Sequence, residues 1–326
     1  MRYNKNTLLS GLLALSVSAV PAYAAVSQSE AARLGNELTP FGSPKAGNAA
    51  GTIPAWDGGL TEPPAGYKES GQHHINPFPD DEVLFTITAQ NMDQYNEYLT
   101  DGVRAMFETY PTTFQIPVYK SRRTHAVPDW VAENTRDNAT SANVVGEGAG
   151  IEGAYGGYPF PILHGDDEEK AWQVIWNHLT RWRGVYVTRR SSEVAVQQNG
   201  DYSLVTSQQE AFFNYYNPEG DESTLDNVIF YYLSFTQSPP RLAGGAILIH
   251  ETMNQIINPR NGWGYNAGQR RVRRAPNLGY DSPIAASDNL RTADDTDIFN
   301  GALDRYNWSY LGKREIYIPY NNYRIG

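Results

Sequence analysis

Two stretches of this sequence begin like known reactive motifs, but each lacks a feature that the chemistry requires. His250-Glu251 is the start of the zinc-protease motif H-E-x-x-H, in which two histidines one helical turn apart hold the metal. Asn254 stands where the second histidine should be. The run Ala246–Ile257 has the composition of a strand, which would put His250 and Glu251 on opposite faces. We therefore expect no metal centre here.

The second stretch, Gly148–Gly153, matches the G-x-G-x-x-G pattern of dinucleotide-binding loops letter for letter. Such a loop binds pyrophosphate only when a buried strand leads into it and a helix follows it. Here Gly156-Gly157 and Pro159-Phe160-Pro161 follow, and this run of glycines and prolines disfavours a helix. We interpret the stretch as a tight turn and expect no cofactor.

The remaining candidates for chemistry are also incomplete. His73 and His74 are adjacent, so they would point apart on a strand, and no third ligand lies at helical spacing. Asp294, Asp295 and Asp297 lack the alternating spacing and closing glutamate of a calcium loop, which favours a solvated turn. No G-x-S-x-G elbow, phosphate-binding loop or cysteine nucleophile is present. We expect a protein that is not an enzyme, and a hydrolase that uses paired Asp and Glu residues stays as a third hypothesis.

Side chains suited to binding are more numerous. Trp263-Gly264-Tyr265 is followed by the run Arg270–Arg274, which contains four arginines in five residues. Because side chains alternate along a strand, Arg271 and Arg273 would share one face and the other two arginines the opposite face. We expect one pair to form ion pairs with the acidic cluster at residues 294–297. The alternative is that a pair binds an anionic head group or a partner.

The arginines end a stretch, Gly184–Arg274, in which the sequence predicts an antiparallel β-meander. Runs rich in Val, Ile, Tyr, Phe and Thr are separated by turn residues such as Asn199-Gly200. Because the run Asn227–Gln237 is apolar or aromatic at nearly every position, we expect both of its faces to be covered, which implies a groove or a lid. The runs are Gly184–Val196, Tyr202–Tyr216, Asn227–Gln237 and Ala246–Ile257.

The run Asp166–Arg183 predicts a helix that packs on this sheet. Acidic residues at its start and arginines at its end suit the helix dipole, and Gly184 is placed to terminate it. Its apolar stripe contains three indoles and must face a large apolar partner. The stripe is Trp172, Ile175, Trp176, Leu179 and Trp182. Such a stripe ordinarily packs in the core. The alternative is that one or two of the indoles also line a ligand pocket.

Residues 1–24 have the pattern of a secretory signal peptide. Arg2 and Lys5 precede the apolar run Leu8–Val20, which is too short to cross a bilayer, and Ala22-Tyr23-Ala24 supplies the cleavage pattern. The mature chain would begin at Ala25. The chain contains no cysteine, so we expect neither disulfides nor a lipid anchor, and its net charge of −10 disfavours nucleic acid as a partner. We expect a soluble protein of a bacterial periplasm.

Residues 25–165 are expected to form an irregular region, rich in Pro and Gly, that wraps along the body. Within it we predict a short helix over Ser29–Leu38 and a longer one that begins at Asp80-Asp81 and ends at Pro111. Ile116–His125 is predicted to be an edge strand or a loop. The helix and sheet of residues 166–326 would form the main body.

A set of short motifs extends over most of the chain after residue 24. They are Gly156-Gly157-x-Pro159-Phe160-Pro161, Ile175-Trp176-Asn177-His178-Leu179, Arg183-Gly184, Trp263-x-Tyr265, Arg270-Arg271-Val272-Arg273-Arg274-x-Pro276, Gly279-Tyr280-Asp281, Phe299-Asn300-Gly301, Asp304-Arg305-Tyr306 and Ile318-Pro319-Tyr320-Asn321. In this order they resemble an exported proteobacterial family, domain of unknown function 1329. That family resembles the LolA/LolB group of lipoprotein carriers. The resemblance implies an α+β fold with a curved, incompletely closed antiparallel sheet and helices on its concave, apolar side.

The resemblance also implies a carrier that moves lipids or other hydrophobic molecules between membranes and can work with a large inner-membrane exporter. It supplies no catalytic residues. Two features depart from the pattern. The chain has no lipidation cysteine, and members of the family continue well beyond Gly326. We therefore expect further strands after the strand-like run Lys313–Tyr320, and hence a truncated product.

We expect a periplasmic carrier or binding protein for lipids or other hydrophobic ligands in envelope trafficking, with no cofactor and no nucleic-acid partner. The alternative is a non-catalytic assembly or docking factor for an envelope exporter or an outer-membrane complex. The ligand is expected in a groove between the predicted helix and the Asn227–Gln237 strand. The predicted ligand-binding residues are Trp172, Trp176, Phe230, Tyr231, Leu233, Phe235, Trp263, Tyr265, Arg271 and Arg273.

Overall fold

The structure is a computed structural model that describes residues 25–68, 73–275 and 279–323 of the 326-residue chain. The predicted signal peptide, residues 1–24, lies outside the described residues. Within the described ranges, no helix is both long enough and apolar enough to span a membrane.

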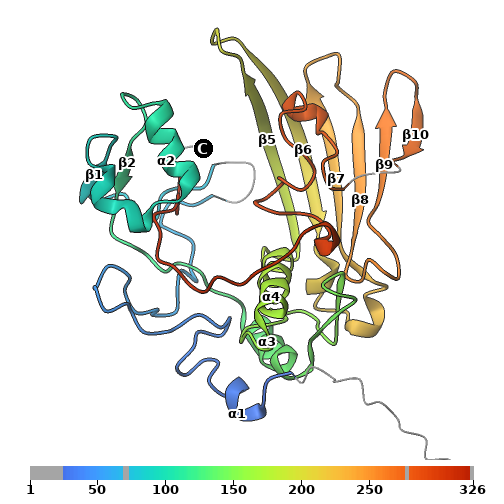
Figure 1. Cartoon of the computed structure of the whole chain (residues 1–326). Coiled ribbons are helices and arrows are strands. Elements are labelled where there is room, and N and C mark those ends of the chain that lie inside the picture. The colour runs from blue at the N-terminus through green and yellow to red at the C-terminus, as the bar shows by residue number, and fades with distance from the viewer. Residues whose placement is uncertain (1–24, 69–72, 276–278, 324–326) are drawn as a thin grey trace, which may run out of the picture.

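A six-stranded antiparallel sheet dominates the molecule and confirms an antiparallel meander (Figure 1). The four predicted runs correspond to β5 to β8, and β9 and β10 were not among the predicted runs. The strand order is β10-β9-β8-β7-β6-β5, so consecutive strands pair with each other, and the sheet is not closed into a barrel. The two edges are formed by β5 and β10. The strands are β5 (Tyr186–Val196), β6 (Tyr202–Phe212), β7 (Val228–Ser238), β8 (Ala246–Thr252), β9 (Asn261–Asn266) and β10 (Arg271–Arg274).

The register of the strands assigns every side chain of the sheet to one of two faces. Residues directly opposite each other on antiparallel strands share a face, and successive residues along a strand point to opposite faces. Val187 and Ala211 are opposite each other and pack in the core cluster of Trp176, so we name their side the packed face. Tyr186 and Phe212 are opposite each other on the other side, which we name the outer face.

Helix α4 (Asp167–Leu179) packs on the packed face near one end of the strands (Figure 1). Its N-cap is Asp166, whose carboxylate accepts a hydrogen bond of 2.9 Å from the Glu169 N–H. The predicted end of this helix was wrong, because the helix stops before Thr180. The Thr180 hydroxyl donates to the Trp176 carbonyl at 2.7 Å and closes the last turn, well before Gly184.

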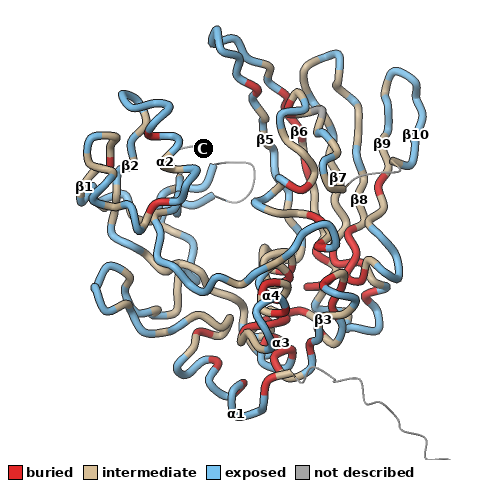
Figure 2. Tube along the Cα trace, viewed as in Figure 1, coloured by how far each residue is buried: buried red, intermediate tan, exposed pale blue. Residues whose placement is uncertain are grey.

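Burial concentrates where α4, helix α3 (Asp129–Ser141) and the adjoining end of the sheet meet (Figure 2). Two tyrosines that follow β6 are fully buried there, and each hydroxyl has a partner. Tyr215 donates to the Gly157 carbonyl at 2.8 Å, and Tyr216 donates to the Thr180 carbonyl at 2.6 Å. These bonds satisfy the polar ends of large apolar side chains and tie the segment after β6 to the Gly157 loop and to the end of α4.

The long helix predicted from Asp80-Asp81 to Pro111 was wrong. The segment instead forms strand β1 (Phe85–Ile87), a 3-10 helix (Met92–Tyr98) and helix α2 (Asp101–Thr109). Asn91 interrupts the helical pattern, because its side chain accepts from the Thr88 N–H and donates to the Thr86 carbonyl. Strand β1 pairs with β2 (Ile116–Val118) in a separate two-stranded sheet that encloses its own small core.

Several short elements complete the described chain. Strands β3 and β4 form a hairpin whose turn contains Gly146 and Gly148, both with positive φ, so the glycine-rich stretch is a turn. The run Lys313–Tyr320 was predicted to be a strand but forms no regular secondary structure. Tyr317 packs in the β1/β2 core, and its N–H donates to the Tyr98 carbonyl. The short elements are α1 (Gln28–Ala31), β3 (Asn143–Val145), β4 (Gly150–Glu152) and the 3-10 turns Asn214–Tyr216, Glu222–Thr224, Ala285–Ser287 and Leu303–Arg305.

Glu169 in α4 supports a stability prediction. It is 6% exposed, and its Oε2 has no hydrogen-bond partner among the described residues. Burial, with a contribution from nearby Asp166, raises the pKa of this carboxyl. At neutral pH this buried, incompletely bonded carboxylate therefore destabilises the folded state. The destabilisation disappears when the pH falls and the carboxyl becomes neutral.

We expect Glu169→Gln to stabilise the protein at pH 7 by about 1 kcal/mol, because an amide of the same shape avoids the burial of charge. The gain should shrink at pH 4, where the wild-type carboxyl approaches neutrality. Thermal melts at both pH values measure it, with Glu168→Gln on the exposed side of the same helix turn as the control. A variant that melts at or below the wild-type temperature at pH 7 contradicts the prediction.

Candidate functional site

Five of the ten predicted ligand-binding residues lie together on the outer face of the sheet. Tyr231, Leu233 and Phe235 alternate along β7, and Trp263 and Tyr265 alternate along β9. Strand β8 lies between these two strands and joins the rows, since Leu248 is opposite both Leu233 and Trp263, and Ala246 is opposite both Phe235 and Tyr265. These five side chains therefore belong to one continuous surface.

Ring contacts cross this surface from β6 to β9. Phe212 stacks on Tyr231 with a centroid distance of 6.3 Å. Tyr231 meets His250 edge-on at 4.7 Å, and His250 meets Trp263 at 4.7 Å. Burial between these rings lowers the pKa of His250, so the imidazole is neutral at pH 7 and behaves as one more flat ring. The strand places Glu251 on the opposite face.

The outer face leaves many large apolar side chains exposed to solvent. Figure 2 shows most of the strand length as intermediate or exposed, in contrast to the buried end near α4. Val272 is 65% exposed and Tyr202 is 66% exposed, although both are large apolar or aromatic residues. A folded protein rarely leaves so large an apolar surface uncovered unless it binds something there. The large apolar and aromatic side chains on this face that are more than a third exposed are Tyr186, Val194, Val196, Tyr202, Leu204, Phe235, Tyr265 and Val272.

The other five predicted residues lie elsewhere. Trp176 is 1% exposed, and its indole N–H donates to the Gly148 carbonyl at 3.0 Å, so it belongs to the core. Trp172 and Phe230 pack against the same cluster. Arg271 and Arg273 are exposed and point to the packed side of the edge strand β10. The structure therefore does not bring these five residues together with the outer-face residues.

The predicted groove between α4 and the Asn227–Gln237 run was also wrong. The space there is a cavity of about 10 Å³ lined by Trp176, Ile229 and Phe230 among others, which is room for about one water molecule. A second hollow, of about 470 Å³, opens between α3 and the residues after β6. Its lining mixes aromatic side chains such as Trp130 and Tyr155 with the acidic residues Asp137 and Glu222.

The predicted ion pairs between the arginine run and the acidic cluster are not formed among the described residues. Asp297 pairs with Arg181 and Arg183, which lie just after α4. Asp294 accepts from the Tyr306 hydroxyl, and Asp295 accepts from Thr292. The reason is topological, because β10 is the edge strand farthest in the sheet order from β5, where α4 leads into the sheet.

Sequence reasoning missed several outer-face residues that complete the surface. Phe212, Leu248, His250 and Val272 were not predicted as ligand-binding residues, although each occupies the alternate position that the face requires. The alternation of side chains between the two faces was visible within each run, but it does not show which residues of neighbouring strands lie opposite each other. That information lies in the hairpin registers, which the turn lengths only suggest.

Residues 86–326 match the family described as "Protein of unknown function (DUF1329)". The uncharacterized protein PA3922 of Pseudomonas aeruginosa is 49% identical over 325 residues, which cover 100% of this chain and 70% of that protein. A crystal structure of a domain from Vibrio parahaemolyticus, named for outer membrane lipoprotein sorting, aligns with 43% of this chain at 18% identity and a TM-score of 0.30. The alignment covers about half of that domain, 52%.

Proposed function

This chain belongs to the DUF1329 family, and from that premise we propose that it binds lipids or other hydrophobic molecules on the outer face of its sheet and carries them within the cell envelope. The observation that supports the proposal is the uncovered apolar surface of β5–β10. The small cavity beneath α4 cannot hold such a ligand, and the larger hollow is lined in part by acidic side chains, among them Asp137 and Glu222.

The size of the surface is sufficient for useful affinity. A ligand that covers a few hundred Å² of apolar surface gains roughly 25 cal/mol per Å², which amounts to several kcal/mol and corresponds to binding in the micromolar range. No covalent step is needed. Binding of this strength is reversible, as a carrier requires, since the ligand has to be released to an acceptor.

The proposed compartment is the periplasm. It is supported by the pattern of residues 1–24, in which two basic residues precede a short apolar run and a small-residue cleavage site. An inner-membrane exporter or an outer-membrane protein would be the donor or the acceptor of the ligand.

A second candidate function is docking on an envelope complex without ligand transport. The outer face favours it in one respect, because the surface is made of aromatic side chains and is not hollowed into a pocket, as in many protein interfaces. The same face would then contact a protein, and a small hydrophobic molecule would have no affinity for it.

Leu233→Asp provides the test of the proposed carrier. The substitution places a charge at the centre of the outer face and should weaken the binding of an environment-sensitive fatty-acid probe at least about tenfold, as desolvating a carboxylate is costly. Titration of the probe by fluorescence measures the dissociation constant. The matched control is Ser234→Asp, which adds the same charge one position further along β7 on the packed face and should leave binding unchanged.

Circular dichroism checks that both variants are folded. If the wild-type protein takes up no probe, or if folded Leu233→Asp binds it as tightly as the wild type does, the carrier proposal is wrong and the docking function replaces it.

A further inference from the structure

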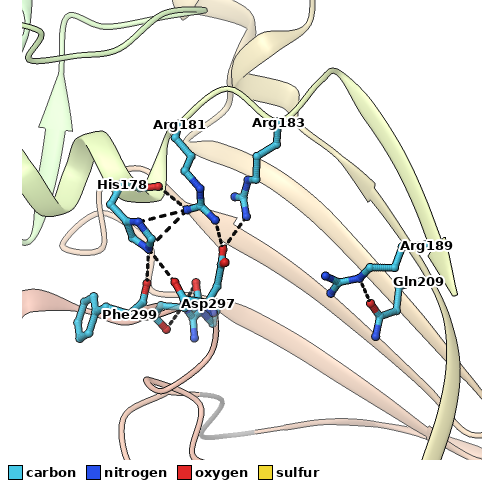
Figure 3. A network of polar contacts seen from close by, with 9 residues as sticks. His178, Arg181, Arg183, Arg189, Gln209, Asp297 and Phe299 are labelled. Carbon is cyan, nitrogen blue, oxygen red and sulfur yellow. Dashed lines mark hydrogen bonds and ion pairs between the residues drawn. The ribbon is translucent and has the colours of Figure 1, made fainter. Parts of the chain in front are cut away.

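A cluster of arginines lies on the packed face, where the residues after α4 lead into β5 and meet the C-terminal segment (Figure 3). Arg181 and Arg183 both pair with one carboxylate oxygen, Oδ2 of Asp297, and the Arg183 contact is 2.9 Å. Arg189 donates to a neutral group, Oε1 of Gln209. Arg181 and Arg183 thus face one carboxylate, and Arg189 lies apart from them on the same face with its bond to Gln209 (Figure 3). The three guanidinium groups and this carboxylate together carry two excess positive charges.

Arg183 is the most constrained of the three. Its guanidinium lies over the rings of Phe213 and Phe230, at 4.5 and 5.8 Å from their centroids. Its Nε is buried and has no hydrogen-bond partner among the described residues. Burial, together with the neighbouring positive charges of Arg181 and Arg189, lowers the pKa of Arg183 to about 10, while Asp297 opposes this shift. The group is still charged at neutral pH and has a donor to spare.

The segment that carries Asp297 is held in a strained conformation. Asp297 and Ile298 have φ values of 60° and 75°, and a β-branched residue rarely adopts this left-handed region. Ile298 is 90% exposed, so its packing does not compensate for the strain. Polar contacts hold the segment instead, since His178 Nε2 lies 2.8 Å from the Asp297 carbonyl and 3.2 Å from the Phe299 carbonyl (Figure 3). Two carbonyl acceptors require the proton to be on Nε2.

From this geometry we propose that Arg181, Arg183 and Arg189 form a binding site for a phosphate or carboxylate group, and that Asp297 occupies the site as an internal substitute. Guanidinium groups bind such oxyanions with two parallel hydrogen bonds, and phosphate offers more acceptor oxygens than the single Asp297 oxygen that two arginines now share. A ligand anion would displace Asp297 and allow the strained backbone to relax. This site is separate from the outer face, on the other side of the sheet.

Asp297→Asn is the first test, because it removes the competing charge and keeps the shape. Isothermal titration calorimetry with inorganic phosphate should show about tenfold tighter binding than in the wild type, as a competitor of the site is lost. The matched control is Asp295→Asn. The Asp295 carboxylate accepts hydrogen bonds from the N–H and hydroxyl of Thr292 and not from Arg181, Arg183 or Arg189. The control therefore removes the same net charge without opening the site. Its phosphate affinity should stay within about twofold of that of the wild type.

Arg189→Gln is the second test, and it allows the proposal to be tested even if Asp297→Asn does not fold. Arg189 is exposed, so its loss should leave the fold intact while weakening anion binding several-fold. Co-sedimentation with vesicles of phosphatidylglycerol or of phosphatidylcholine identifies the source of the anion. A preference for the anionic vesicles that Arg189→Gln abolishes indicates a lipid head group, and a change in phosphate binding alone indicates a free anion.

The proposal is overturned if Asp297→Asn binds phosphate no more tightly than Asp295→Asn does. It is also overturned if Arg189→Gln changes neither phosphate binding nor the vesicle preference. Leu233→Asp separates this proposal from that of the outer face, since it should lose the fatty-acid probe and retain the anion.

Discussion

Arg260→Ala is expected to lower the free energy of unfolding by about 3–5 kcal/mol, because it leaves a carboxylate buried without its cation. The side chains of Arg260 and Glu251 are 10% and 8% exposed, and their closest N···O distance is 2.6 Å. Arg260 also donates to the carbonyl of Asn300 at 3.0 Å and so joins β8 to the C-terminal segment. Chemical denaturation followed by tryptophan fluorescence measures the loss.

Two comparisons make this prediction specific. Arg33→Ala removes an arginine whose pair with Glu37 is exposed, and it should change stability by less than about 0.5 kcal/mol. The double variant Arg260→Met with Glu251→Leu should be more stable than Arg260→Ala, since it leaves no charge buried. If Arg260→Ala lowers the free energy of unfolding by less than about 1 kcal/mol, or if the double variant is no more stable than Arg260→Ala, the buried Arg260–Glu251 pair does not stabilise the fold in this way.

Trp176→Ala is the second substitution with a large expected effect, also about 3–5 kcal/mol. It removes a fully buried indole from the centre of the main cluster and leaves the Gly148 carbonyl without its donor. The surrounding side chains come from α3, α4 and the sheet, so they can only partly fill the space. Thermal and chemical denaturation both measure the effect.

Val174→Ala serves as the control on the same helix, because Val174 is 39% exposed and its truncation should cost less than about 0.5 kcal/mol. Trp176→Phe should retain most of the stability and should bind the fatty-acid probe as the wild type does, as its side chain is not on the outer face. Loss of probe binding in folded Trp176→Phe would restore the original prediction that this indole lines a ligand site.

The β-meander was predictable because its signals are local. Strands β5, β6 and β7 carry both β-branched and aromatic residues, and turns such as Asn199-Gly200 separate consecutive strands. Consecutive antiparallel strands need only short connections, so the sequence order also gives the order in the sheet. The N-terminal end of α4 was similarly predictable, since Asp166 caps it and acidic residues follow.

The predicted helix after Asp80-Asp81 failed for the opposite reason. The apolar residues of this segment recur at helical spacing. Strand β1 nevertheless pairs with β2, which is distant in the sequence, and Asn91 turns the chain between β1 and α2. A periodic pattern of moderate strength does not reveal such a partner, which lies more than twenty residues away in the sequence.

The amino-acid sequence by itself determined which residues are apolar, roughly where β5, β6, β7 and β8 begin, and that one helix with a tryptophan stripe must be buried. Only the tertiary structure decided which face of each strand meets that helix. Shifting a strand by one residue exchanges its two faces, and the registers that prevent this arise from contacts between different strands. Trp176 thus became part of the core, whereas Tyr231 and Trp263 came to lie on the surface that we propose binds the ligand.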